Sequence, residues 1–155
     1  MIREAYYWVG DWEGLLHHLD CCELALGYED FEARQERKMR CAERTRALLQ
    51  LRRYDETIEA CRDLEQIADE DEKSTITGVH AQVLYEKGEF DDALDLLRSA
   101  NLDDSPRVWL YRSLSHASLG HEDEAMDCYR EYEELVGVDV IGRSRLFKIM
   151  PYQPV

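Results

Sequence analysis

The chain contains 155 residues, of which 45% are hydrophobic and only three are proline, which is enough for one domain with a substantial core. Its formal charge of -15 disfavours general binding to nucleic acids or anionic membranes, because phosphate contacts require a cationic surface. Residues 1–9 are cut short by Gly10 and Asp11, so they do not predict a signal peptide or a membrane span. The five cysteines form an odd set without paired spacing, which is typical of reduced thiols. These features predict an acidic, cytoplasmic protein.

The first predicted unit spans residues 2–27. A short amphipathic stretch over residues 2–9 precedes a turn at Gly10, and the apolar residues that follow recur at three and four, which predicts a helix from Leu15 to Leu26. Gly27 is the expected end of that helix. After it, the charge-rich residues from about 29 to 52 predict one extended helix.

Three further units are predicted, each a pair of amphipathic helices around a turn. They span residues 37–69, 74–101 and 106–135. The acidic run 69–72 leads to Ser74 or Thr75, the expected N-cap of the third unit, and Pro106 suits the first helical position of the fourth. The tail, residues 136–155, breaks the pattern. We expect it to cap the last pair, and the alternative is that it docks into a neighbouring molecule.

The turn at the centre of each unit is followed by acidic residues and then by a small or aliphatic residue that starts an apolar stripe. The equivalent positions are Trp12, Tyr54, Phe90 and Glu122, which are separated by 42, 36 and 32 residues. Stacked helix pairs recur with periods in this range. The sequence therefore predicts an all-α fold of repeated antiparallel helix pairs.

The third unit carries small, aliphatic and aromatic residues and a glycine at characteristic positions, namely Ala81, Leu84, Tyr85, Gly88, Phe90, Ala93 and Leu94. This pattern resembles the tetratricopeptide repeat (TPR), a helix-turn-helix unit of about 34 residues. The other units depart from it, with Arg52 at the turn glycine, Thr57 at the alanine and Glu122 at an aromatic position. The resemblance covers residues 37–135 and extends weakly to residue 5.

The resemblance implies a right-handed superhelix, a TPR-like α-solenoid, whose first helices line a concave groove for a peptide or helix of a partner. Carried over by position, the groove residues are Arg46, Gln50, Gln82, Tyr85, Glu86, Arg107 and Tyr111. Family members that clamp a C-terminal carboxylate use an asparagine where this chain has Glu43, Val79 and Tyr111. Binding of that type is not expected.

A basic segment stands out in this acidic chain. Residues 34–53 hold eight basic and two acidic residues, a formal charge of +6. Arg37, Arg40 and Arg44 share one helical face and form what we call the basic stripe. One interpretation is that the stripe neutralises acidic residues of neighbouring helices. The other is that it binds an acidic peptide, a phosphate-bearing ligand or RNA.

The histidines and cysteines give the best candidate for metal or thiol chemistry. His17 with Cys21 and His18 with Cys22 are each four residues apart, a spacing compatible with zinc on a helix. Two ligands do not complete a structural site, and no second cluster exists in the sequence. We therefore predict no metal, no cofactor and no catalytic residue, and a metal- or thiol-dependent enzyme at His18/Cys22 is the least favoured alternative. His116 is expected to be a core histidine.

Four aromatic residues lie close together near the N-terminus: Tyr6, Tyr7, Trp8 and Trp12. They are too many for one side of a short helix, so some are expected to pack inward and the surplus to form a partner surface or a homodimer contact.

The leading functional prediction is a non-enzymatic protein–protein interaction module, either an adaptor or a small dedicated chaperone. In length and acidity the chain is similar to the small acidic chaperones that bacteria use for secretion substrates. The alternative is a regulatory protein that uses the basic segment, residues 34–53, to bind an acidic partner or nucleic acid.

Overall fold

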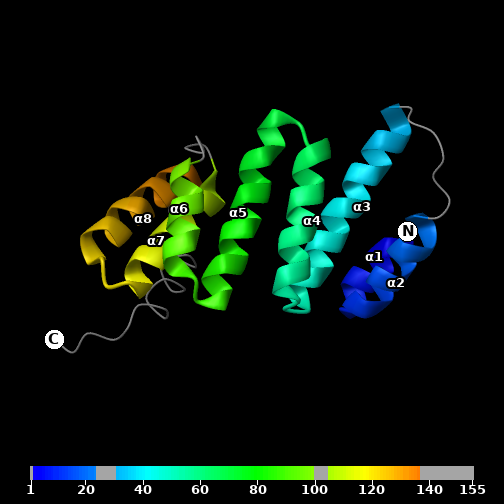
Figure 1. The fold of residues 1–155 in the computed structure, drawn as a ribbon, viewed down its shortest axis with the longest axis horizontal. Helices are drawn as coiled ribbons and strands as arrows, with labels where there is room; N and C mark the ends of the chain where they lie inside the picture. Colours follow the sequence, from blue (N-terminus) through cyan, green and yellow to red (C-terminus); the bar gives the residue numbers. More distant parts are fainter. Residues whose placement is uncertain (1, 24–30, 100–104, 137–155) are drawn as a thin grey trace. The chain divides into compact units, whose positions relative to one another are not determined.

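The computed structural model of the protein describes residues 2–23, 31–99 and 105–136, which contain eight α-helices (Figure 1). The helices are α1 (Ile2–Val9), α2 (Trp12–Glu23), α3 (Phe31–Gln50), α4 (Tyr54–Ile67), α5 (Glu70–Lys87), α6 (Phe90–Ser99), α7 (Pro106–Ser118) and α8 (Glu122–Val136). No residue in these ranges belongs to a β-strand, so the all-α prediction is confirmed for them. Helix α3 corresponds to the extended charged helix that the sequence predicts.

The chain divides into two compact units, Met1–Asp69 and Glu70–Val155. In the first unit, α2 packs against α1 and α3, and α3 packs against α4. In the second unit, α5 packs against α6 and α7, and α7 packs against α6 and α8. Each unit therefore contains two helical hairpins. The single TPR-like domain stays a prediction.

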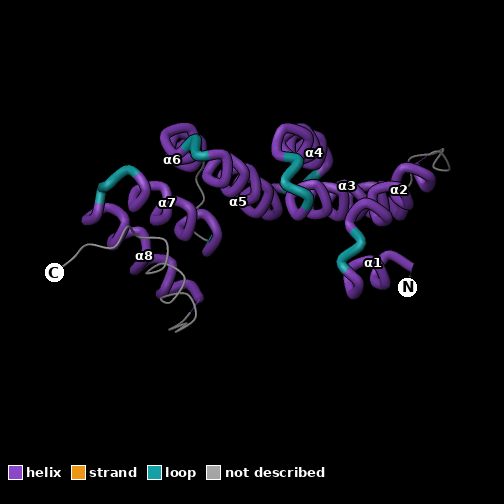
Figure 2. Tube along the Cα trace, turned by 90° about the horizontal axis from the view of Figure 1, so that it is seen from below, coloured by secondary structure: helices purple, strands orange, loops and turns teal. Residues whose placement is uncertain are grey.

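Turns of one backbone type join the helices of each hairpin (Figure 2). The first or second residue after the first helix has a positive φ in all four turns, 69° at Gly10, 57° at Arg52, 83° at Gly88 and 79° at Gly120. At the third turn, the Gly88 N–H donates to the Tyr85 carbonyl and the Glu89 N–H to the Leu84 carbonyl, both at 2.9 Å. The same pair of hydrogen bonds recurs at the other three turns. This pair defines the Schellman motif, in which a left-handed residue reverses the chain and satisfies the last carbonyls of a helix.

The second helix of every hairpin begins at the equivalent turn positions, Trp12, Tyr54, Phe90 and Glu122. Helix α2 thus starts three residues before Leu15, the start that the sequence predicts. Three residues after each start, Leu15, Thr57, Ala93 and Ala125 are all 0% exposed. This complete burial explains why the pattern holds a small or aliphatic side chain at three of the four positions. Thr57 is tolerated because its hydroxyl donates to the Arg53 carbonyl at 2.8 Å, so that no polar atom is left unpaired.

The predicted start of the third unit is wrong. Helix α5 begins at Glu70, so neither Ser74 nor Thr75 is its N-cap. The acidic run continues into the helix because carboxylates near the N-terminus interact favourably with the helix dipole, and glutamate has a high helix propensity. Lys73 also pairs with Glu70 one turn earlier. Gly27, the expected end of the first unit, and the tail after Val136 lie outside the described residues.

Each unit has its own apolar core. The core of the first unit contains Leu15, Leu16, Leu19, Ala47, Leu48 and Ala60, with Tyr6, Tyr7, Trp12 and Leu51 packed against it. The second unit has one cluster of Ala81, Leu97 and Val108, and another of Leu114 and Tyr129. Tyr85, Leu110, Tyr111 and Tyr132 surround the second of these clusters. Tyr85 of α5 and Tyr111 of α7 thus pack against buried side chains.

Two serines on α7 are fully buried, with different consequences. The Ser113 hydroxyl donates to the Ala125 carbonyl of α8 at 2.7 Å. The Ser115 hydroxyl oxygen has no hydrogen-bond partner among the described residues. A buried hydroxyl is favourable when it is bonded and costs free energy when it is not, so the two serines are expected to act in opposite directions on stability.

Arg52→Gly is expected to stabilise the protein by about 0.5–1 kcal/mol, because glycine removes the steric cost of a positive φ. The greater conformational entropy of glycine in the unfolded chain offsets part of this gain. Gly88→Ala is expected to destabilise it by about 1 kcal/mol. A Cβ at Gly88 would meet no atom within 4 Å, so this cost is conformational. Urea unfolding gives both values. The control is Arg52→Ala, which keeps the Cβ; equal stability of the alanine and glycine variants at residue 52 would contradict the strain argument.

Ser113→Ala is expected to cost about 1 kcal/mol of unfolding free energy, whereas Ser115→Ala is expected to be neutral or to stabilise by up to about 1 kcal/mol. The two substitutions remove the same atom from one helix, so each is the control for the other in urea or thermal unfolding. An equal loss from both variants would show that Ser115 also has a partner.

Candidate functional site

Helices α5 and α7 pack against each other in the second unit. At one point along this contact, a Cβ on Gly78 would lie 3.0 Å from both Cγ and Cδ of Arg107, so the aliphatic stem of Arg107 lies close to the α5 backbone. Further along, the rings of Tyr85 and Tyr111 meet with 5.8 Å between their centroids. Residue numbers rise on both helices from the first contact to the second, so the two helices run in the same direction.

An aromatic group lies at the C-terminal end of α5. The Tyr85 ring contacts Tyr111, and it also contacts Phe90, the first residue of α6, at a centroid distance of 5.4 Å. Tyr85 and Tyr111 are half-buried against the cluster of Leu114 and Tyr129. Their rings are therefore held in place from one side while part of each remains accessible. Phe90 is not among the groove residues predicted from the sequence, although its position directly after the turn places it beside Tyr85.

Polar side chains border these aromatic rings. The Gln82 amide donates to the Glu86 carboxylate at 2.8 Å, one helical turn apart on α5. Glu86 and Arg107 are exposed. The predicted residues of the second unit, Gln82, Tyr85, Glu86, Arg107 and Tyr111, thus lie on neighbouring turns of α5 and α7, and we call them the tyrosine face. An aromatic centre with a charged and polar rim is the usual anatomy of a protein-binding surface.

The other two predicted groove residues belong to the first unit. The Arg46 guanidinium lies over the Tyr7 ring, 5.6 Å from its centroid. Burial raises the pKa of Tyr7, with a further contribution from the Glu43 carboxylate. Gln50 is exposed at the end of α3. Arg46 and Gln50 belong to the first unit and the tyrosine face to the second.

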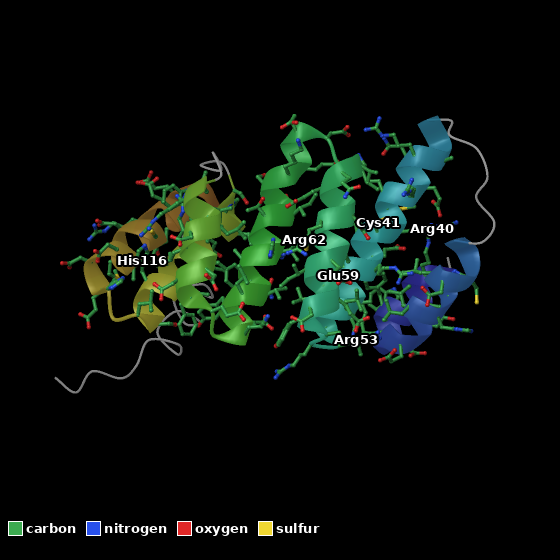
Figure 3. The ribbon with its side chains drawn as sticks, viewed as in Figure 1. Arg40, Cys41, Arg53, Glu59, Arg62 and His116 are labelled. Carbon is green, nitrogen blue, oxygen red and sulfur yellow. The ribbon has the colours of Figure 1, made fainter. Side chains whose placement is uncertain are left out.

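The basic stripe on α3 has carboxylate partners within the first unit. The Arg40 guanidinium, labelled in Figure 3, donates from Nε to the Glu36 carboxylate at 2.9 Å, and this hydrogen bond lowers the pKa of Glu36. Arg44 pairs with Asp20 of α2. Arg37 is exposed, and none of the described residues pairs with it. Intramolecular neutralisation therefore accounts for two of the three arginines.

Further ion pairs connect the helices around α3. Arg3 of α1 lies 3.1 Å from the Glu36 carboxylate and 3.3 Å from that of Glu43. Lys38 donates to Asp69 at 2.9 Å, and Arg53 pairs with Glu56 at 2.6 Å. Lys38 and Arg53 belong to the basic segment, residues 34–53, but not to the basic stripe, so these two contacts neutralise its flanking residues.

The expected histidine–cysteine pairs are only partly described. His17 Nε2 lies 3.8 Å from Cys21 Sγ, and both side chains are exposed on α2. The Cys22 side chain lies outside the described residues. Among the side chains that the structure describes, no three from His, Cys, Asp and Glu gather into a group able to hold a metal ion. His116 is half-buried, so it is not the fully enclosed core residue that was expected.

The N-terminal aromatic residues separate as predicted into inward and outward sets. Tyr6, Tyr7 and Trp12 pack against the core of the first unit, whereas Trp8 is 89% exposed. Val9 beside it is 75% exposed. A homodimer through this surface stays a prediction.

No protein-family model matches the chain, and no curated protein is significantly similar to it. Within the described ranges, none of the helices combines the length and the apolar character that crossing a membrane requires.

Cys61 is expected to resist alkylation in the folded protein, while Cys21 reacts readily. Burial raises the pKa of the Cys61 thiol to about 12, and the thiolate is the reactive form. Cys21 is exposed. Iodoacetamide labelling at pH 8, read out by peptide mass spectrometry, compares the two sites within one sample. Rapid modification of Cys61 without denaturant would contradict this prediction, and denaturant is the control that should expose it.

Proposed function

We propose that this chain is a non-enzymatic protein-interaction module, an adaptor or small dedicated chaperone, that binds a peptide segment of another protein on its tyrosine face. The proposal is in keeping with the TPR resemblance, in which first helices of successive pairs present the binding residues. The observation that carries it is the ring pair of Tyr85 and Tyr111, with centroids 5.8 Å apart across α5 and α7 and with both rings half-buried.

The chemistry of this face suits a peptide. Tyrosine rings held by core packing offer a large contact area at little additional entropic cost. The carboxylate of Glu86, the guanidinium of Arg107 and the amide of Gln82 lie beside them and are able to bond backbone amides and carbonyls of an extended segment. Residues of this type, tyrosine above all, are enriched among those that dominate binding energy in protein interfaces.

One feature favours an interaction module over the regulatory alternative. The pairing of Arg40 and Arg44 with carboxylates of the same unit leaves less of the basic stripe for an acidic partner or nucleic acid. We therefore do not propose a second function at α3.

The test uses photocrosslinking followed by binding measurements. A photoreactive phenylalanine analogue that replaces Tyr85 is expected to crosslink a specific partner protein in cells of the source organism. The matched control places the same analogue at Arg98, an exposed residue of α6, where no such crosslink is expected. The captured segment is then synthesised and titrated against purified variants.

Tyr85→Leu/Tyr111→Leu is expected to weaken binding of that segment by tenfold or more, about the effect of removing two hot-spot residues. Leucine keeps apolar packing against the core, and Tyr85→Phe/Tyr111→Phe, which keeps the rings, is the control. Circular dichroism checks that all variants are folded. Equal capture from residues 85 and 98, or unchanged affinity of the leucine variant, would contradict the proposal.

A further inference from the structure

Two histidines, His116 and His121, flank the turn between α7 and α8. The Nδ1 atoms of His116 and His121 are 3.4 Å apart, and the ring centroids are 5.6 Å apart. His116, labelled in Figure 3, lies in the last turn of α7, and His121 immediately precedes α8. His116 is half-buried and His121 is exposed, so the pair is accessible from solvent.

The two Nδ1 atoms are separated by the length of a long hydrogen bond between the rings, and this length also fits a metal chelate. Donor and acceptor in a normal N–H hydrogen bond approach to about 2.7–3.2 Å. Two nitrogens that bind one tetrahedral zinc ion at about 2.0–2.1 Å each lie about 3.3 Å from one another. The observed 3.4 Å is close to that edge of the tetrahedron.

The Schellman turn fixes this pair in place. The His121 N–H donates to the His116 carbonyl at 2.9 Å, and the left-handed Gly120 between them has a φ of 79°. These two positions of the motif commonly hold side chains that contact each other. The corresponding residues at the other three turns are Tyr6 and Asp11, Leu48 and Arg53, and Leu84 and Glu89. Only the fourth turn places two imidazoles there.

Charged groups of both signs surround the pair. The first turn of α8 contains Glu122, Asp123 and Glu124, and the Glu124 carboxylate acts electrostatically on His116. The guanidinium groups of Arg98 and Arg112 act on His116 in the opposite sense. No third metal ligand joins the pair within the described ranges, so water would fill the remaining coordination positions.

From the convergence of the two Nδ1 atoms across a rigid turn, we propose that His116 and His121 form an open two-histidine site for a divalent transition-metal ion such as Zn²⁺. Imidazole is a favoured ligand for Zn²⁺, Cu²⁺ and Ni²⁺. The bound ion joins the end of α7 to the start of α8. It is independent of the tyrosine face and of the function proposed for it.

The test is a Zn²⁺ titration of the full chain, without any added histidine tag, followed by NMR of the five histidine rings. The expected result is saturable binding with large shifts of the His116 and His121 Nδ1 signals. His121→Asn removes one ligand and keeps a residue that caps helices well, so it is expected to fold and to lose the saturable binding. The melting temperature is expected to rise with Zn²⁺ in the wild type and not in this variant.

His17→Asn is the matched control, because His17 is an exposed histidine beside Cys21 on α2. This variant is expected to bind Zn²⁺ as the wild type does. Three results would overturn the proposal: no saturable binding by the wild type, unchanged binding by His121→Asn, or loss of binding in His17→Asn with the shifts confined to His17. Thermal unfolding in chelator confirms that both variants are folded without metal.

Discussion

The repeated left-handed turn is the constraint on which each hairpin depends. It satisfies the last carbonyls of one helix, reverses the chain, and starts the next helix so that its fourth residue is buried. Three of the four turns use glycine, for which this backbone conformation is unstrained, and the second uses Arg52. The buried position excludes an unpaired polar group, because such a group would lose its hydrogen bonds to water there. Thr57 satisfies this condition only through its bond to the Arg53 carbonyl.

The same turns also determine where the chemistry of the second unit lies. Tyr85 is the residue whose carbonyl receives the Gly88 N–H, and Phe90 is the first residue after that turn, so their ring contact follows from the geometry of the motif. His116 and His121 hold the neighbouring pair of positions at the next turn, those that Leu84 and Glu89 hold at this one. Parallel packing of α5 on α7 then brings Tyr111 against Tyr85. Glycine at position 78 leaves the space that the Arg107 stem fills.

Much of this fold follows from the sequence, because the turn is a local feature with strict residue preferences. The starts of α4, α6 and α8 were predictable from the turn residues and from the small side chain three positions later, whereas α2 begins three residues before its predicted start at Leu15. The start of α5 was not, because an acidic run is compatible with both a loop and a helix N-terminus. Ion pairs distant in sequence, such as Arg44 with Asp20, depend on packing that no local pattern encodes. The histidine pair was detectable in principle, since the two contacting positions of every Schellman turn differ by five in residue number, as His116 and His121 do.

The two units differ in the side chains that remain accessible to ligands, because most cations of the first unit are paired with carboxylates. In the first unit, Arg3, Lys38, Arg40, Arg44 and Arg53 have carboxylate partners within the unit. Such partly exposed pairs contribute little to stability, but they reduce the positive potential that would attract an anion. In the second unit, Tyr85 and Tyr111 are fixed by a core yet still accessible, and the Nδ1 atoms of two imidazoles lie 3.4 Å apart. Rigid, partly exposed groups suit a binding site, because their ordering entropy is already lost on folding. The second unit therefore provides the stronger candidates for recognition, although the basic segment of the first is the more conspicuous feature of the sequence.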